Sequence, residues 1–265
     1  MKTTLVTGSA GRLGQAAVHE LVCQGHRVFG IDCKPTPGLP TSLVDTLQNP
    51  TLLRDLMKGV GTVIHLAAIP DDPVWPLPAE GGDNFLHELI PNNLVPTYHV
   101  LEAARHAKVD KVVLASSGQV VWDQSFDGPF PITVDAKPTP RWWYAGTKLF
   151  LEAIGESYSK QGFFSVIAVR LGFCPRDPGQ VHQIALEKRD QDVYLSPGDA
   201  GRFFDCCVKA NRPLGSFDLV YATSIPKHRV RFDLEPAKRL LGFEPKDTWP
   251  DGVTLPSMVS SSPSK

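Results

Sequence analysis

The sequence lacks the residue patterns that metal sites, disulfide frameworks and membrane segments require. Its five cysteines are an odd number and form no Cys-x-x-Cys pair, and its eight histidines show neither His-x-x-x-His nor His-Glu-x-x-His spacing. We therefore expect no disulfide framework and no protein-built metal site. No long apolar run and no signal-peptide pattern is present, so we expect a cytoplasmic protein with reduced thiols.

Net charge is also nearly absent. Lysine and arginine number 27 and aspartate and glutamate 28, which leaves a formal charge of −1. This balance gives no electrostatic reason to expect nucleic acid or an anionic membrane as a partner. The 24 prolines are the one residue type in excess, and they cluster in residues 70–84 and 122–143.

Apolar strand-like runs alternate with helix-patterned segments over most of the chain. Residues 3–7 and 27–32 are predicted strands, and apolar residues at helical spacing predict a helix over 12–24. Further strands are expected at 41–45, 61–68, 110–117 and 163–172, and further helices at 50–59, 92–107, 144–162, 198–210 and 233–241. Runs rich in Val, Ile and Leu suit parallel strands that are covered on both faces. The prediction is an α/β, Rossmann-type doubly wound parallel sheet.

The same pattern divides the chain into three expected regions. Residues 1–172 form the sheet domain, 173–255 a small substrate-binding cap interleaved with the main sheet, and 256–265 a disordered tail. The proline-rich stretches 70–84 and 122–143 are predicted loops that leave the carboxyl ends of strands. In doubly wound sheets these ends face the ligand crevice.

A glycine-rich segment joins the first predicted strand to the first predicted helix. "VTGSAGRLG" places Gly8, Gly11 and Gly14 at this turn. Glycine lets the backbone approach a pyrophosphate, and the exposed N–H groups at the helix start favour its charge. The segment predicts dinucleotide binding.

Three charged residues near this loop bear on the choice of dinucleotide. Asp32 ends the second predicted strand, where a carboxylate accepts hydrogen bonds from the adenosine ribose and repels a 2′-phosphate. Arg12 and Lys34 favour the opposite choice, since either could pair with that phosphate. We expect NAD, with NADP as the weaker alternative.

These and further motifs resemble the extended short-chain dehydrogenase/reductases, the NAD-dependent epimerase/dehydratase family. The Gly-x-x-Gly-x-x-Gly spacing is similar to that of the family. So are the segments "VIHLAA" (63–68), "NNLVPTYHVLEAAR" (92–105), "VVLASSGQVV" (112–121), "YAGTK" (144–148) and "VRLG" (169–172). The resemblance covers residues 3–175.

The resemblance implies roles for individual residues. The cofactor would be bound by Gly8, Ala10, Gly11, Arg12, Leu13, Gly14, Asp32, Asp45, Leu66, Ala67, Ala68 and Asn93. Among these, Asp45 would contact the adenine and Asn93 would stabilise the central strand. Ser117 would orient the substrate hydroxyl, with Ser116 as the alternative, and Tyr144 and Lys148 would be the catalytic pair. Family members commonly form homodimers through two long helices, here 92–107 and 144–162.

The spacing of Tyr144 and Lys148 supports this role independently. Residues four apart on a helix share a face. A free tyrosine titrates near pH ~10, too high for a general base at neutral pH. A neighbouring ammonium favours the phenolate and lowers that pKa, so Tyr144 could accept the proton of a substrate alcohol. The alternative is an aromatic helix start that carries a lysine by chance.

The length of the chain and its departures from the family's residue pattern limit the type of reaction that we expect. Dehydratases of the family carry an acidic pair after the serine, where this chain has Gly118-Gln119. Length and the "YLSPGDAGRF" segment most resemble the uronate dehydrogenases, which typically have Asn-His at that place and a serine where this chain has Phe173. We therefore expect a dehydrogenase of a small sugar, sugar acid or polyol, with a sugar epimerase or a non-catalytic dinucleotide-binding regulator as alternatives.

Several residues are candidates for contact with the substrate. Gln119 could bond hydroxyl groups, Phe173 would shape the pocket, and Arg176 could clamp a carboxylate. His182 is a further candidate, and for His182 as for Arg176 the alternative is a solvated loop residue. The tryptophans Trp75, Trp122, Trp142 and Trp143 are also candidates, and packing roles explain them equally well.

Overall fold

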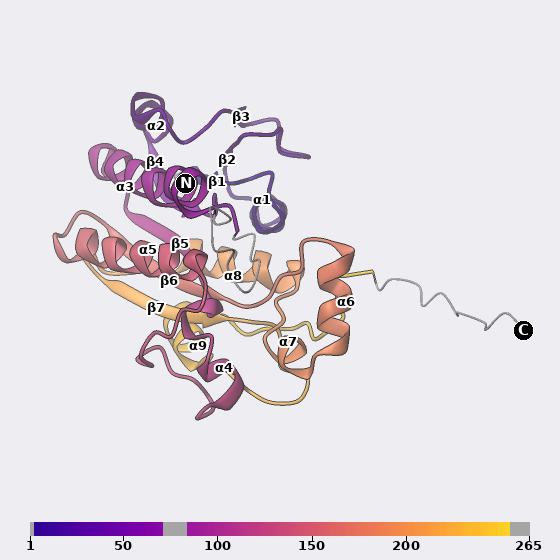
Figure 1. Ribbon diagram of the computed structural model, residues 1–265. Helices are drawn as coiled ribbons and strands as arrows, with labels where there is room; N and C mark the ends of the chain where they lie inside the picture. The colour runs from indigo at the N-terminus through magenta and orange to yellow at the C-terminus, as the bar shows by residue number, and fades with distance from the viewer. Residues whose placement is uncertain (1–2, 71–83, 255–265) are drawn as a thin grey trace, which may run out of the picture.

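The computed structural model describes residues 3–70 and 84–254, and a seven-stranded, all-parallel sheet forms its centre (Figure 1). The strand order is β3-β2-β1-β4-β5-β6-β7. The strands are β1 (Thr3–Thr7), β2 (Val28–Asp32), β3 (Ser42–Val44), β4 (Val60–His65), β5 (Lys111–Ser117), β6 (Ser165–Leu171) and β7 (Phe217–Ala222). Every residue of β4 and of β6 is buried, which confirms the prediction of a sheet covered on both faces.

Two apolar cores lie on the two faces of the sheet. One core packs α1 (Arg12–Cys23), α8 (Pro197–Lys209) and α9 (Glu235–Leu241) against the strands. The other packs α2 (Pro50–Leu56), α3 (Val95–Ala107) and α5 (Trp143–Lys160). The short helices α4 (Gln124–Asp127), α6 (Pro178–Leu186) and α7 (Lys188–Asp192) lie at the border of the sheet, with α6 beside α7 (Figure 1).

The structure corrects the sequence-based expectations in three ways. The strand at 163–172 is not the last of the sheet, because β7 extends it from within the predicted cap. The predicted helix at 92–107 has its regular part from Val95, and a π-helical segment, η1 (Phe85–Leu94), precedes it. Helices α6 and α7 had no apolar periodicity strong enough to predict them. Residues 71–83 and 255–265, which include most of one predicted loop and the predicted tail, lie outside the described residues.

The direction of strand order reverses beside β1. Strands β2 and β3 follow on one side of β1, and β4 to β7 follow on the other. Ligands of doubly wound sheets bind in the crevice outside the carboxyl ends of the strands at such a reversal. The loop after β1 and the segment after β4 therefore border the expected crevice. No helix within the described ranges is long and apolar enough to cross a membrane.

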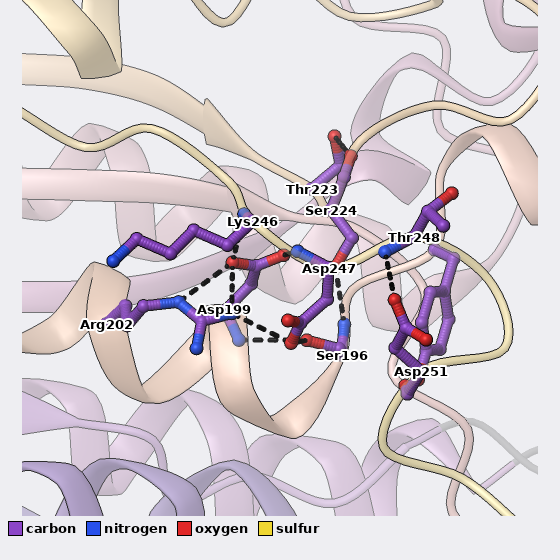
Figure 2. Close-up of polar contacts among 10 residues, drawn as sticks. Ser196, Asp199, Arg202, Thr223, Ser224, Lys246, Asp247, Thr248 and Asp251 are labelled. Atoms are coloured by element: carbon purple, nitrogen blue, oxygen red, sulfur yellow. Dashed lines mark hydrogen bonds and ion pairs between the residues drawn. The ribbon is translucent and has the colours of Figure 1, made fainter.

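A buried carboxylate fastens the last described segment to α8 (Figure 2). Asp199 has no exposed surface and lies in the first turn of α8. Its carboxylate accepts the backbone N–H groups of Lys246 (2.8 Å) and Asp247 (3.0 Å) and the guanidinium of Arg202 (2.7 Å). Ser196, the N-cap of α8, donates to the carboxylate of Asp247. Asp199 thus binds two successive backbone N–H groups of residues 246–251, and the Ser196–Asp247 bond adds a second tie to the start of α8.

We expect Asp199→Asn to lower the free energy of unfolding by about 3 kcal/mol. The amide has only one acceptor oxygen. Its NH2 group would point at N–H donors that now bond to the carboxylate, so buried donors would be left unpaired. Urea unfolding followed by circular dichroism measures the change. Asp251→Asn is the control: Asp251 is exposed and its side chain accepts only the Thr248 N–H among the described residues, so a loss below about 1 kcal/mol is expected there. Equal losses in the two variants would contradict the special role of Asp199.

Candidate active site

The loop after β1 is held in a conformation that only glycine accommodates. Gly8 has a φ of +71°, and a Cβ at this residue would lie 2.6 Å from the backbone nitrogen of Ala67. A Cβ at Gly14 would overlap the carbonyl oxygen of Gly8. The first glycine thus lets β1 and the segment after β4 approach each other, and the third lets α1 begin directly beneath the loop.

The start of α1 fits a phosphate group. Its N-cap is Gly11, and no side chain caps the first-turn N–H groups, so Arg12 and Leu13 present their amides at the helix end. Arg12, the first residue of α1, is half-buried and adds a positive charge to this helix end. Unsatisfied amides at the positive end of a helix dipole favour an anion. These features fit the pyrophosphate of a dinucleotide.

Asp32 is bonded to this loop. One carboxylate oxygen accepts the N–H of Ala10 (3.0 Å), and the other accepts the N–H of Lys34 (3.1 Å). The carboxylate therefore fixes the loop as well as ending β2. Asp45 lies just after β3 and is exposed, and its backbone N–H donates to the carbonyl of Asp32 (2.9 Å). The two acidic residues thus border the same end of the crevice.

A buried neutral histidine supports the floor of the crevice. Burial, and secondly the charge of Lys148, lowers the pKa of His65 to about 3. Thr97 donates its only hydroxyl proton to the carbonyl of Asn93 (2.6 Å), so His65 must donate from Nε2 to Thr97 (3.1 Å). His65 Nδ1 consequently accepts from Thr7 (2.8 Å). The network assigns one tautomer and joins β1, β4 and α3.

Asn93 continues this network toward α5. Its amide accepts the N–H of Ile69 (2.8 Å) and donates to the carbonyl of the same residue (2.9 Å). It also donates to Thr147 (3.4 Å), whose hydroxyl donates to the carbonyl of Tyr144 (2.7 Å). Asn93 therefore fixes the end of the segment Leu66-Ala67-Ala68 relative to the first turn of α5, a role close to the predicted stabilisation of the central strand.

Tyr144 and Lys148 lie on the same face of α5. The ammonium of Lys148 is 5.2 Å from the centre of the Tyr144 ring. Lys148 is 4% exposed, and burial lowers its pKa to about 8. Within the described part of the chain, no carboxylate pairs with this ammonium. A buried cation without a counter-charge is costly, which points to a ligand or reaction that uses it.

Two neighbouring serines end β5 and face opposite ways. Ser116 is buried and donates to Glu152, which forms a bidentate ion pair with Arg170 at 3.0 Å. Arg170 also donates to the hydroxyl of Tyr221 (3.1 Å). Ser117 lies outside this network, is half-buried, and accepts only the N–H of Gln119 (3.2 Å) in the described structure. Ser116 is thus engaged inside the fold, which favours Ser117 for substrate contact.

Two hollows border the carboxyl ends of the strands. The first, which we name the β4–β6 cavity, has a volume of about 700 Å³. It is lined by residues 69–70 after β4, by Asn84, Glu88 and Asn92 at η1, and by Arg176 and Asp177 after β6. The second, the α1–α8 groove, has a volume of about 730 Å³ and includes Arg12, Gly198 and again Arg176. Arg176 alone lines both among the described residues.

The other substrate candidates separate into exposed and packed residues. Phe173 pairs through its backbone with Val193 and Leu195 and packs in two apolar clusters. Trp122 packs against Phe126, and the guanidinium of Arg189 lies 4.4 Å from its ring. These contacts give both aromatics a packing role. Trp143 is 48% exposed beside Phe85, and Trp75 lies outside the described residues.

The buried polar residues around the site have no counterpart among the residues predicted from the sequence. His65 and Arg170 each interrupt an otherwise apolar strand, and Glu152 follows Lys148 by one helical turn. A charged or titratable residue within a buried strand requires a partner. That requirement was the available signal, but the partner could not be identified before the strands and helices were placed.

Comparison with known proteins agrees with this geometry. The model of the NAD dependent epimerase/dehydratase family matches residues 4–174. The chain belongs to this family. Membership confirms the predicted resemblance, the Rossmann-type fold and an enzyme of the NAD-dependent dehydrogenase/epimerase type.

Two curated relatives align with nearly the whole chain. The NAD-dependent glucose-6-phosphate dehydrogenase of Haloferax volcanii is 28% identical over 260 residues, with 92% of each chain covered. The L-arabinose 1-dehydrogenase (NAD(P)(+)) of the same organism is 28% identical over 271 residues, covering 93% of this chain and 97% of its own. Both are sugar dehydrogenases.

Solved structures of family members share the fold. MoeE5 in complex with UDP-glucose and NAD has a TM-score of 0.73 at 24% identity, covering 94% of this chain and 95% of its own. A mutated uronate dehydrogenase has a TM-score of 0.72 at 24% identity, covering 93% and 82%. The first of these structures contains NAD in this fold.

Proposed function

We propose that this protein is an NAD-dependent dehydrogenase that removes a hydride from a hydroxyl-bearing carbon of a small sugar, sugar acid or polyol. The observation that carries the proposal is the buried ammonium of Lys148, which has no counter-charge in the described structure and lies against Tyr144. The full-length similarity to two sugar dehydrogenases supports the same reaction class.

The residues at the end of β5 and the start of α5 have complementary roles in this proposal. Ser117 holds the substrate oxygen, and Tyr144 accepts the hydroxyl proton as general base. The ammonium of Lys148 stabilises the phenolate form that accepts this proton. Bound NAD would supply the hydride acceptor. Removal of the hydroxyl proton is thus assigned to Tyr144, assisted by Lys148 and Ser117.

Cofactor contacts follow the loop geometry. We assign the pyrophosphate to the amides of Arg12 and Leu13, for which the uncapped start of α1 is the support. The N–H of Gly11 already donates to the carbonyl of Gly8 (3.0 Å), so Gly11 contributes the shape of the loop. Asp32 and Asp45 would face the adenosine, and the carboxylate of Asp32 favours NAD over NADP. Residues 66–68 would line the nicotinamide half of the crevice.

A substrate panel tests the proposal. Sugars, sugar acids and polyols are supplied with NAD or NADP, and the absorbance of the reduced nicotinamide is followed. We expect stoichiometric NADH formation with at least one sugar and a preference for NAD of at least tenfold in kcat/KM. Conversion of a sugar without net NADH would establish an epimerase. Affinity for NAD with no turnover of any compound would instead indicate a dinucleotide-binding regulator.

Two further expectations stay predictions. The outer faces of α3 and α5 would form the homodimer, and the 48% exposed Tyr98 on α3 supports an apolar contact there. Sedimentation equilibrium checks the oligomeric state. A cytoplasmic location is the other expectation.

A further inference from the structure

The charges around the β4–β6 cavity narrow the class of substrate, given the proposed function. The cavity lies beside the strand end and helix start to which we assign the oxidation. In the sheet, β5 lies between β4 and β6, so the loops that wall the cavity flank the strand end that carries Ser117. On the side of α5, the ring of Phe85 in η1 packs 5.8 Å from that of Trp143, the residue before Tyr144.

The walls of this cavity hold more negative than positive charge. Among the described lining residues, Glu88 and Asp177 are carboxylates and Arg176 is the single cation. A carboxylate or phosphate on the substrate would face these carboxylates with at most one guanidinium to offset them.

The polar groups of the cavity are suited to hydroxyl groups. Asn84 donates to the carboxylate of Glu88 (3.1 Å), and Asn92 donates to the backbone carbonyl of the same residue (2.9 Å). Asp177 caps α6 by accepting the N–H of Gln180 (2.9 Å). These contacts hold both carboxylates in place and leave acceptor positions on them. A sugar hydroxyl donates to such acceptors, whereas an anionic group cannot.

The guanidinium of Arg176 has a second candidate ligand, the cofactor, besides the substrate. Arg176 also lines the α1–α8 groove together with Arg12, the first residue of α1. Both guanidinium groups therefore lie near the helix end assigned to the cofactor phosphates. An anionic substrate would compete with these phosphates for Arg176.

We propose that the substrate is an uncharged aldose or polyol, and that neither uronates nor sugar phosphates are preferred. In this proposal Arg176 lies between the cofactor and the cavity, and it does not clamp a substrate carboxylate as the sequence suggested. The reaction is unchanged: a C–H hydride goes to the nicotinamide, the hydroxyl proton goes to Tyr144, and a C=O bond forms, which at an anomeric carbon gives a lactone.

Matched sets of sugars test this class. D-glucose, D-glucuronate and D-glucose 6-phosphate form one set and the corresponding galactose compounds another, with L-arabinose and xylitol as neutral compounds lacking a sixth carbon. Initial rates of NADH formation and the rise in melting temperature of the NAD-loaded protein are both measured. We expect the best neutral compound to exceed every anionic one by at least tenfold in kcat/KM and to give the larger thermal shift.

The two readouts separate the two proposals. A uronate or sugar phosphate that equals or exceeds the neutral compounds overturns the substrate class and leaves the dehydrogenase intact. Stabilisation by neutral sugars without any NADH overturns the dehydrogenase and supports the class. If no neutral sugar stabilises the protein or is oxidised, the class is wrong.

Removal of one wall charge tests the electrostatic reason. We expect Glu88→Gln to raise kcat/KM for the anionic sugars relative to the neutral ones by about fivefold at low salt, and less at high salt. Glu244→Gln is the matched control, because this glutamate pairs with Lys238 near α9 and lines neither hollow among the residues described. An unchanged ratio in Glu88→Gln would overturn the electrostatic argument.

Discussion

Replacing Lys148 by methionine is expected to stabilise the cofactor-free protein while removing most of its activity. Burial lowers the pKa of Lys148 to about 8, against about 10.4 for an unperturbed lysine, and each pKa unit corresponds to about 1.4 kcal/mol. The buried ammonium therefore costs the folded state up to about 3 kcal/mol at neutral pH. Methionine fills similar space without charge, so we expect a gain of about 1–3 kcal/mol at pH 7.

The pH dependence of this gain has a defined direction. Below pH 8 the lysine is charged in both the folded and unfolded states, and the cost is fully present. Between pH 8 and about 10.4 the folded protein loses the proton first, so the stability of the wild type rises with pH. The difference in melting temperature between Lys148→Met and the wild type should shrink over this interval. Calorimetry at pH 7 and pH 10 measures it.

Lys111→Met is a control for which we expect the opposite change in folding stability. Its side chain is also buried, but its ammonium donates to the carbonyls of Val208 (3.0 Å) and Ala210 (2.6 Å) at the end of α8. Lys111→Met should destabilise the protein by about 1–3 kcal/mol, because these acceptors lose their donor. If Lys148→Met is destabilised like Lys111→Met, the Lys148 ammonium makes stabilising interactions in the folded protein, and the predicted cost of its burial is wrong.

Tyr144→Phe should lower kcat by about 10²- to 10⁴-fold, the range that general base catalysis contributes. The substitution removes one oxygen and keeps the ring beside Lys148, so the affinity for NAD should change by less than about threefold. Isothermal titration with NAD and steady-state kinetics with the best sugar measure the two quantities. Turnover within tenfold of the wild type would refute the assignment of the base.

Tyr158→Phe is the matched control for this change. Tyr158 lies on the same helix, and its hydroxyl donates to Glu102 on α3. Its loss should cost about 1 kcal/mol of stability and leave kcat unchanged. A comparable fall in kcat for both tyrosines would mean that the damage comes from the helix and not from the missing general base.

Structural features that depend on residues close together in the chain could be predicted from the sequence. The glycine loop, six of the seven strands and the shared face of Tyr144 and Lys148 follow from spacing within one or two elements. Strand β7 could not be predicted in the same way, because "FDLVYA" alternates weakly and its place depends on pairing with β6.

Contacts between distant segments had no such local signature. The bond from Ser116 to Glu152 decides which of two adjacent serines is available, and it joins residues that are 36 apart in sequence. Arg176 could be identified as a candidate, but its position between two hollows depends on α1, η1 and α8 together. Our proposal for the substrate class rests on that arrangement, which the sequence alone left open.

The wall of the β4–β6 cavity is built from residues that belong to neither apolar core. Tyr144 and Lys148, by contrast, extend from a helix that the core and the Glu152–Arg170 ion pair hold in place. Substitutions in the wall should therefore change substrate choice with little loss of folding stability. Directed evolution of new sugar specificities has its natural starting points at Asn84, Glu88, Asn92 and Asp177.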